Sequence, residues 1–241
     1  MEAFANSDIG KVRDMNQDSY YISDKDDKIK LYIVADGMGG YKGGEIASKL
    51  AIESSKNYII NNFDQIKKER DQIIELIKNA IEYANMVVYE KSKEVPELAG
   101  MGTTIDVCLI YSNKIYIGHI GDSRVYRLRK DFFRKLTVDD SYVEQLLKEG
   151  NITKEEAYNH PKKNMLTKAL GCTAFVEPTV LVKGFMKGDI LLMCTDGLTN
   201  MLKDDKICEI IKQNSEQASK ELVKKANEQG GYDNITAVII L

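Results

Sequence analysis

Apolar and polar positions along the chain follow two periods, one typical of helices and one typical of strands. Apolar residues at intervals of three and four predict helices over about 44–60 and 69–92. Along 105–111 apolar residues alternate with others, as they do in a half-buried strand. Further strands are expected within 19–35 (two, around a polar turn) and at 114–119, 123–128, 179–183, 189–195 and 234–240, and further helices at about 204–213 and 216–229. Strands and helices therefore occur in separate blocks.

The short connections between strands indicate antiparallel pairing. The turns at 112–113 and 121–122 are too short for the crossover that parallel strands need. Separate strand and helix blocks are typical of α+β proteins. About ten strands exceed what a single twisted sheet usually carries, so we expect two packed antiparallel sheets with helix pairs on their outer faces.

Composition predicts an ordinary globular protein. The 241 residues include only three prolines, and neither a flexible linker nor a low-complexity stretch divides them. We therefore predict a single domain over 1–241. Residues 139–170 are polar and only weakly hydrophobic, and we expect them to form a flap inserted over a site.

Charge and hydropathy argue against several classes of partner. The net charge is −3, and adjacent lysines occur only as isolated pairs such as Lys67-Lys68, which argues against a nucleic-acid partner. No apolar run approaches the roughly 18 residues of a membrane span, and the N-terminus lacks a charged-then-apolar signal. We therefore expect a cytoplasmic protein without a nucleic-acid or membrane partner.

The cysteines and histidines do not predict a zinc site. None of the four cysteines has C-x-x-C spacing, and the chain has only two histidines. The remaining candidate ligands are carboxylates, which suit magnesium or manganese.

Four carboxylates stand at the ends of predicted strands. Asp36 and Asp196 each follow a buried apolar run and precede a glycine, on which we expect the chain to turn sharply. Asp18 and Asp233 each precede a run. Asp-Gly is also a common turn dipeptide, so this pattern alone leaves a plain turn and a metal site as alternatives. If the four carboxylates converge, divalent cations would offset their mutual repulsion.

Seven motifs in a fixed order carry a resemblance to a known family. They lie at residues 10–18, 34–40 with 43–48, 102–104, 118–124, 166–171, 195–198 and 233–236. The second contains Asp36-Gly37 and ends in Gly39-Gly40, and the fourth is a Gly-Asp-Ser-Arg turn. In these residues and this order the chain resembles the metal-dependent (type 2C) protein serine/threonine phosphatases. Met38 and the glycine pair Gly43-Gly44 are similar to the bacterial branch.

The resemblance implies a four-layer αββα sandwich of two antiparallel sheets flanked by helix pairs, with a binuclear metal site at one edge of the sheets. It implies that Asp36 bridges two Mn²⁺ or Mg²⁺ ions and that the Gly37 carbonyl binds one of them. Asp196 and Asp233 would be direct ligands, and Asp18 would hold metal-bound water. A hydroxide bridging the two ions would then attack the phosphorus atom in line.

The resemblance also implies roles for Asp122 and Arg13. Asp122 would help to bind a third metal together with Asp196, which makes two or three ions per chain. Arg13 would grip the substrate phosphate, because its planar fork matches phosphate oxygens. A surface ion pair with a nearby aspartate, Asp14 or Asp18, is the alternative reading of Arg13. Arg13, Asp36 and Asp18 form the expected catalytic set.

The histidines and two departures from the family pattern leave the proton donor open. His160, in the expected flap, could protonate the leaving group or orient the flap. His119 lies beside glycines and is expected to be structural, bonded to backbone. Met38 stands where many eukaryotic relatives carry a histidine proposed as general acid, so that role does not carry over. Asp140 stands where bacterial relatives often place a histidine, which puts contacts between flap and substrate in doubt.

These residues predict a metal-dependent hydrolase of phosphoserine and phosphothreonine in proteins. We expect a monomer that acts on phosphoprotein substrates and is opposed by a serine/threonine kinase. The alternatives are a catalytically inactive phosphoprotein-binding signalling module and a phosphatase dedicated to one regulatory partner. An inactive module would typically have lost a metal ligand, whereas Asp36, Asp196 and Asp233 are all present.

Overall fold

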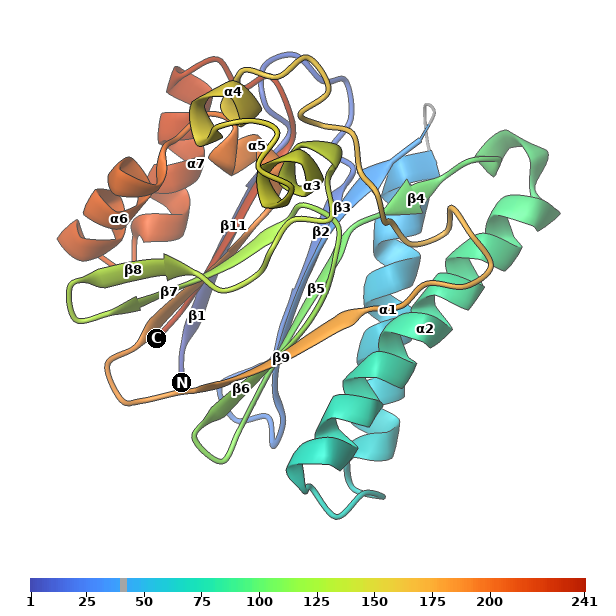
Figure 1. Ribbon diagram of the computed structural model, residues 1–241. Helices are drawn as coiled ribbons and strands as arrows, with labels where there is room; N and C mark the ends of the chain where they lie inside the picture. The colour runs from blue at the N-terminus through green and yellow to red at the C-terminus, as the bar shows by residue number, and fades with distance from the viewer. Residues whose placement is uncertain (40–42) are drawn as a thin grey trace.

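Figure 1 shows the computed structural model of the chain, which describes residues 1–39 and 43–241, without the side chain of residue 154. Gly40 of the second motif lies outside the described residues. Two antiparallel sheets pack face to face, and helices cover both outer faces. The predicted α+β sandwich of two sheets between helix layers is therefore confirmed.

The first sheet carries the two ends of the chain. It contains, in spatial order, β1 (Ala3–Asp8), β11 (Ile235–Ile240), β10 (Ile190–Cys194), β7 (Arg124–Arg129) and β8 (Phe132–Lys135). Helices α6 (Asp204–Gln213) and α7 (Ala218–Glu228) pack on its outer face through a cluster of buried apolar side chains. The one-turn helix α5 (Asp196–Thr199) follows β10 directly.

The second sheet is covered by the two longest helices. Its strands, in spatial order, are β2 (Asp18–Ile22), β3 (Lys30–Met38), β5 (Ile105–Tyr111), β6 (Lys114–Ile120) and β9 (Thr179–Gly184), and the short β4 (Gly102–Thr103) also pairs with β3. Helices α1 (Gly43–Phe63) and α2 (Arg70–Glu94) lie side by side on its outer face, and the 3₁₀ helix η1 (Pro96–Leu98) follows α2.

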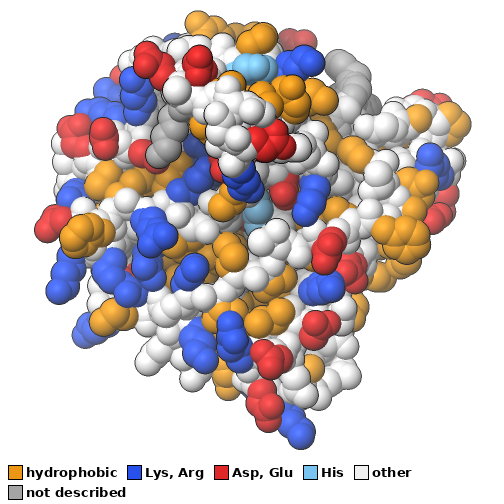
Figure 2. Space-filling model, in the orientation of Figure 1, with side chains coloured by type: hydrophobic (Ala, Val, Ile, Leu, Met, Phe, Trp, Pro, Cys, Tyr) orange, Lys and Arg blue, Asp and Glu red, His pale blue; other side chains and the backbone are white. Residues whose placement is uncertain are grey.

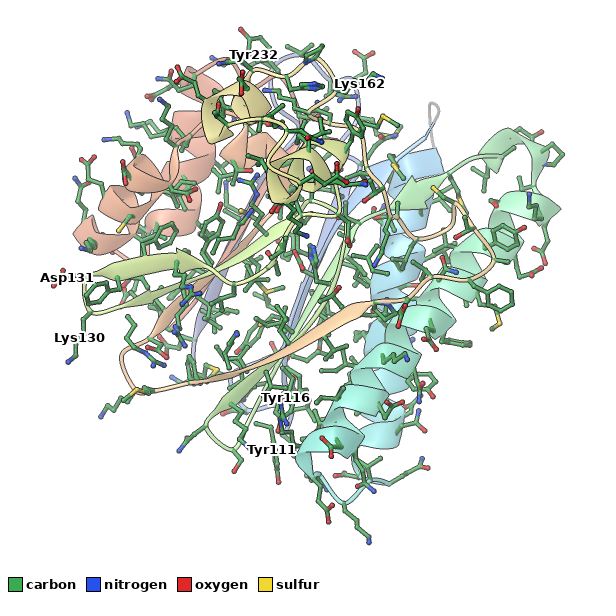
Figure 3. All side chains as sticks on the ribbon, viewed as in Figure 1. Tyr111, Tyr116, Lys130, Asp131, Lys162 and Tyr232 are labelled. Atoms are coloured by element: carbon green, nitrogen blue, oxygen red, sulfur yellow. The ribbon has the colours of Figure 1, made fainter. Side chains whose placement is uncertain are left out.

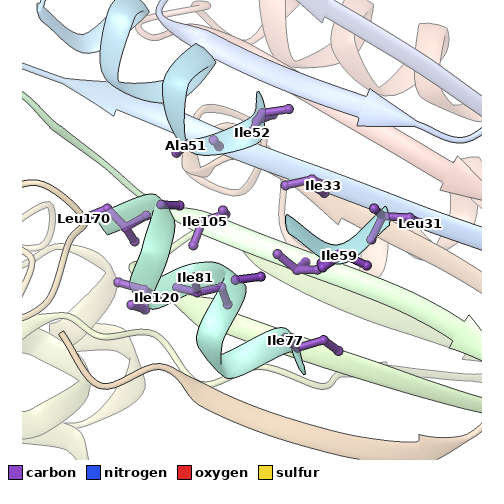
Figure 4. Packing of buried hydrophobic residues seen from close by; sticks show 14 of the residues in the cluster. Leu31, Ile33, Ala51, Ile52, Ile59, Ile77, Ile81, Ile105, Ile120 and Leu170 are labelled. Atoms are coloured by element: carbon purple, nitrogen blue, oxygen red, sulfur yellow. The ribbon is translucent and has the colours of Figure 1, made fainter. Parts of the chain in front are cut away.

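Strand β3 shows how side-chain alternation builds the layers. Leu31 and Ile33 point outward and pack under α1 and α2, among the side chains drawn in Figure 4. Tyr32 and Val34 point inward and join the apolar layer between the two sheets. Because side chains alternate along a strand, Asp36 continues the inward series. Its carboxylate therefore lies where the space between the sheets opens at their edge.

The connection from β8 to β9 contains the predicted flap. It carries two short helices, α3 (Tyr142–Lys148) and α4 (Lys154–Tyr158). Ser141 caps α3 by accepting a hydrogen bond from the Glu144 amide, and Thr153 forms a capping box with Glu156 at the start of α4. Isolated bridges join Ser141 to Leu166 and Thr103 to Leu170, and so tie this connection to itself and to β4.

Several expectations about local structure were wrong. The chain does not turn at Gly37, because β3 continues through Asp36-Gly37 to Met38, and Asp196-Gly197 opens the helix α5. Strands β1, β4 and β8 were not predicted, since they are short and, in β1 and β8, mostly half-buried, which blurs the apolar pattern. No helix in the described part of the chain is long and apolar enough to cross a bilayer.

Candidate metal centre

Carboxylates from four separate segments converge at one edge of the sandwich. They surround a cavity of about 210 Å³ and belong to β3, the β6–β7 turn, α5 and the loop before β11. Its lining includes Asp36, Asp122, Asp196, Asp233, Gly37 and Arg13. Six of the eight predicted site residues therefore line one cavity. The other two, Asp18 and His160, lie outside its lining, and Asp18 is buried opposite Asp36 in the β2–β3 pair.

Asp18 is a buried carboxylate held from two strands of the opposite sheet. Its Oδ2 atom accepts hydrogen bonds from Thr195 Oγ1 (2.9 Å) and Thr236 Oγ1 (2.7 Å), whereas Oδ1 is buried without a hydrogen-bond partner among the described residues. Asp18 also stands directly opposite Asp36 in the β2–β3 pair. Like charges in that arrangement destabilise a sheet. The fold therefore fixes two carboxylates in contact range and leaves their repulsion for a cation to offset.

The pKa values of this cluster are shifted upward. Burial, together with the neighbouring Asp196 and Asp233, raises the pKa of Asp18 to about 7, although hydrogen bonds from Thr236 and Thr195 oppose the shift. Burial and Asp233 raise the pKa of Asp196 to about 6. Burial and the surrounding carboxylates also raise the pKa values of Asp36 and Asp122 well above the usual range. A site that disfavours its own negative charge in this way is suited to bind positive ions.

The donor set fits hard divalent cations. It consists of carboxylate oxygens, among them the buried and unpartnered Oδ1 atoms of Asp18 and Asp196. No three His, Cys, Asp or Glu side chains within residues 1–39 and 43–241 form a closed ligand group. An ion bound here would therefore be coordinated by a pair of carboxylates, and backbone carbonyls and water would complete its coordination shell. Mg²⁺ and Mn²⁺ accept such a mixed oxygen shell.

Close backbone packing explains the glycine at position 37. A Cβ atom there would lie 2.0 Å from the Gly44 carbonyl oxygen and 2.6 Å from that of Gln17. No side chain can occupy that space, so α1 approaches β3 only at a glycine. The Asp36 backbone is held equally firmly, because its N–H donates to Thr104 Oγ1 (2.9 Å) and its carbonyl accepts from Thr103 Oγ1 (2.8 Å).

Arg13 reaches the cavity from the loop before β2. Its Nη2 atom donates to Asp233 Oδ2 over 2.8 Å, and about half of its side chain remains exposed. The expected alternative partners, Asp14 and Asp18, are not the ones it contacts. The guanidinium therefore stands at the cavity rim, beside one of the predicted metal ligands.

The two histidines occupy different environments. His160 Nδ1 accepts a hydrogen bond from the Lys162 amide, and its ring packs against Tyr142, so it orders the end of α4. His119 Nε2 bonds to the Val138 carbonyl oxygen (3.0 Å), as expected of a structural histidine. Its Nδ1 atom also pairs with Asp106 over 2.7 Å in the space between the sheets. Burial opposes charge on the ring, but Asp106 raises the pKa of His119 overall.

Sequence reasoning missed the groups that hold the carboxylates in place. The hydroxyls of Thr103, Thr104, Thr195 and Thr236 orient Asp36 or Asp18. Asp140 stands where bacterial relatives often place a histidine. Its Oδ2 atom accepts a hydrogen bond from the Gly121 amide (3.3 Å), which connects the flap to the turn that carries Asp122. The paired threonines lay within the motifs, but their partners are up to 218 positions away in sequence.

Comparisons of this chain with a family model, with related sequences and with solved structures agree with one another. A family model described as Protein phosphatase 2C matches residues 11–229. The serine/threonine phosphatase stp of Listeria innocua is 36% identical over 242 residues, which cover 100% of this chain and 95% of that protein. The serine/threonine phosphatase of S. agalactiae superposes with a TM-score of 0.89 at 35% identity, covering 100% of this chain and 99% of that one. The catalytic domain of the phosphatase PstP, in complex with two manganese ions, superposes with a TM-score of 0.86 at 34% identity, covering 99% and 96%.

Proposed function

This chain belongs to the protein phosphatase 2C family and is a protein serine/threonine phosphatase, and we propose that it hydrolyses phosphoserine and phosphothreonine with the help of two or three Mn²⁺ or Mg²⁺ ions held by its carboxylate cluster. The observation that carries the proposal is the convergence of Asp36, Asp122, Asp196 and Asp233 on one cavity. Among the described residues that line this cavity, Arg13 is the one basic side chain that faces these crowded carboxylates.

We assign the metal ligands as follows. Two ions would be held by Asp36, which they would share, together with the Gly37 carbonyl, Asp196 and Asp233. Asp18 would hold water of the ions, and Asp122 with Asp196 would hold a third ion. When bound, the ions supply an acidified water as nucleophile and positive charge for the phosphoryl oxygens. The hydrogen bonds from Thr195 and Thr236 support the assignment of Asp18, because they occupy one oxygen and leave the other buried without a hydrogen-bond partner among the described residues.

Arg13 binds the phosphate in this proposal. A guanidinium fork matches two phosphate oxygens and remains charged at every relevant pH. Its contact with Asp233 holds it at the cavity rim, where the phosphoryl group must enter. If Asp233 held a cation, its contact with Arg13 would weaken and the Arg13 donors would be available to the substrate phosphate. The group that protonates the leaving oxygen is not assigned to His160, which orders the end of α4.

The proposal also covers domain organisation, oligomeric state, location and partners. We infer that the chain is one catalytic domain over 1–241 with a flap at 139–170. It acts as a monomer in the cytoplasm on phosphoproteins that a serine/threonine kinase has modified. The two-manganese PstP structure supports manganese as one competent ion.

Phosphate release from a phosphothreonine and a phosphoserine peptide tests the proposal. We expect release with Mn²⁺ or Mg²⁺ and none with chelator. Arg13→Ala should raise KM by roughly tenfold or more, since it removes a charge-assisted contact, while Mn²⁺ binding stays intact. Arg70→Ala, at the start of α2, is the matched control and should change nothing. Folded protein that releases no phosphate with any metal would instead support the inactive binding module.

A further inference from the structure

Seven basic side chains gather where the open side of the sandwich exposes β7, β8 and β9. They are Lys114, Arg127, Arg129, Lys130, Arg134, Lys183 and Lys187, which we call the basic edge. Figure 2 shows Lys and Arg side chains concentrated over these strands on the left of the molecule, with few carboxylates between them. The whole chain carries a net charge of −3, so this surface departs from the average.

Direct contacts join the two sheets at the basic edge. Arg127 Nη1 and Arg129 Nη2 both donate to the Gly184 carbonyl oxygen at the end of β9, over 2.9 and 3.0 Å. Lys114 lies opposite Gly184 in the β6–β9 pair. Arg134 stands directly opposite Arg127 in the β7–β8 pair. Three of the cations, Arg127, Arg129 and Arg134, therefore lie on one face of β7 and β8, against the end of β9.

Few acidic groups balance this charge. Asp189 is buried and pairs with Arg129, and Asp131 at the hairpin tip pairs with Lys212. The positive charges around Arg127 are crowded, because burial together with the neighbouring Arg129 and Arg134 lowers the pKa of its guanidinium. Two like charges directly across a strand pair are unfavourable. An anionic partner would relieve this repulsion.

Two large apolar side chains project beside the basic edge, one from the start of β8 and one from the loop between β9 and β10. Phe132, beside the hairpin tip formed by Lys130 and Asp131 (Figure 3), is 79% exposed. Met186, in the loop between β9 and β10, is 58% exposed. The two segments are connected, because Phe132 lies opposite Arg129 and both Arg129 and the Met186 amide bond to Asp189. The headgroup region of an anionic bilayer matches this combination, because it offers phosphates to the cations and an apolar layer to Phe132 and Met186.

We propose that the basic edge docks the protein on an anionic membrane surface, with Phe132 and Met186 entering the interface between headgroups and acyl chains and the surrounding Lys and Arg contacting lipid phosphates. Basic residues with neighbouring apolar side chains are the recognised combination for such peripheral binding. This surface is independent of the assigned catalytic function. It also revises the expectation of no membrane partner, which rested on the absence of an apolar span.

The geometry leaves the catalytic cavity accessible in the docked state. Strand β7 begins two residues after Asp122 at the cavity and runs to Arg129 at the basic edge. At about 3.3 Å per residue, its six residues carry the chain roughly 17 Å away from the carboxylates. Docking at the basic edge would therefore keep the carboxylates roughly 17 Å from the docked residues of β7 rather than at the lipid contact itself.

Co-sedimentation of the full chain with vesicles tests the proposal. Vesicles of phosphatidylcholine alone are compared with equal mixtures of phosphatidylcholine and phosphatidylglycerol, at low and high salt. We expect binding to the anionic vesicles only, weakened by salt. Arg134→Glu should lower the partition coefficient by about tenfold or more, since each basic residue near an anionic surface contributes about fivefold. Phe132→Ser should lower it by roughly tenfold through loss of apolar burial.

Matched variants elsewhere on the surface complete the experiment. Lys67→Glu reverses an exposed lysine in the α1–α2 loop, and Phe175→Ser removes an aromatic that is 92% exposed. Neither should change vesicle binding, and all four variants should keep wild-type hydrolysis of a small phosphate ester. Absence of binding to anionic vesicles, or equal loss in the control variants, would overturn the proposal. Vesicle binding that needs Arg134 but not Phe132 would overturn the insertion of apolar side chains and leave a purely electrostatic contact with lipid phosphates.

Discussion

Replacing Asp18 with asparagine should have opposite effects on stability with and without metal. Asp18 has its pKa raised to about 7 from an ordinary value of 3.8, because it is buried near other carboxylates. An acid whose folded-state pKa is raised favours the folded state only while protonated. Its contribution is therefore intact below about pH 4 and is lost as the pH rises toward 7. At pH 8 the charged Asp18 destabilises the metal-free protein.

The size of the effect follows from the shift. Each pKa unit corresponds to about 1.36 kcal/mol, so a shift of about three units sets an upper limit near 4 kcal/mol. Since the neighbouring carboxylates share part of this energy, we expect Asp18→Asn to stabilise the metal-free protein at pH 8 by about 2–4 kcal/mol. The asparagine carbonyl can still accept from Thr195 and Thr236, so no hydrogen bond is lost there. For a chain of this size the gain is roughly 4–16 °C in Tm.

The assay is thermal unfolding of wild type and variant in chelator and in excess Mn²⁺, at pH 5 and pH 8. In chelator the variant should gain Tm at pH 8 and little at pH 5. In Mn²⁺ it should gain less stability from the metal than wild type does, because a group that supports the ions is gone. Asp26→Asn, in the exposed β2–β3 turn, is the matched control. Equal destabilisation by Asp18→Asn at both pH values in chelator would refute the reasoning.

Two further predictions concern the same cluster. Asp122→Ala should retain two Mn²⁺ ions in calorimetry yet turn over a phosphopeptide at least about tenfold more slowly, since only the third ion loses a ligand; an unchanged rate would remove that ion from the mechanism. Mn²⁺ affinity should rise with pH between about 5 and 8, because Asp196 and Asp18, with pKa values raised to about 6 and about 7, must lose protons before an ion can bind. A flat affinity profile over that range would contradict the raised pKa values.

The residues that line the cavity were predictable because each carries a local signal. Asp36 and Asp196 end long apolar runs, and the family motifs surround them in order. The structure gathers Asp36, Asp122, Asp196, Asp233, Gly37 and Arg13 at one cavity. Their roles in catalysis remain predictions. The local backbone conformation was harder to predict from the sequence. An Asp-Gly pair favours a turn, whereas β3 continues through Asp36-Gly37.

Contacts between distant segments had no signal in the sequence. Thr236 and Asp18 are 218 positions apart, and only the packing of the two sheets brings them together. The Asp106–His119 pair was likewise hidden, because its members alternate with apolar residues on neighbouring strands. The basic edge was missed for a related reason. Strand alternation spaces Arg127 and Arg129 two residues apart, and Lys183 comes from the other sheet, so no run of basic residues marks the surface.

The most direct test of the account is a single Mn²⁺ titration that follows bound metal by calorimetry and phosphate release from a phosphothreonine peptide in parallel. We predict that wild-type protein gains activity as its carboxylate cluster fills, whereas Asp36→Asn, which removes the charge shared by two ions, neither binds the pair nor releases phosphate. Asp26→Asn should behave as wild type. Phosphate release by Asp36→Asn at the wild-type rate, or by wild type in excess chelator, would contradict the claim that these carboxylates hold the catalytic metal ions.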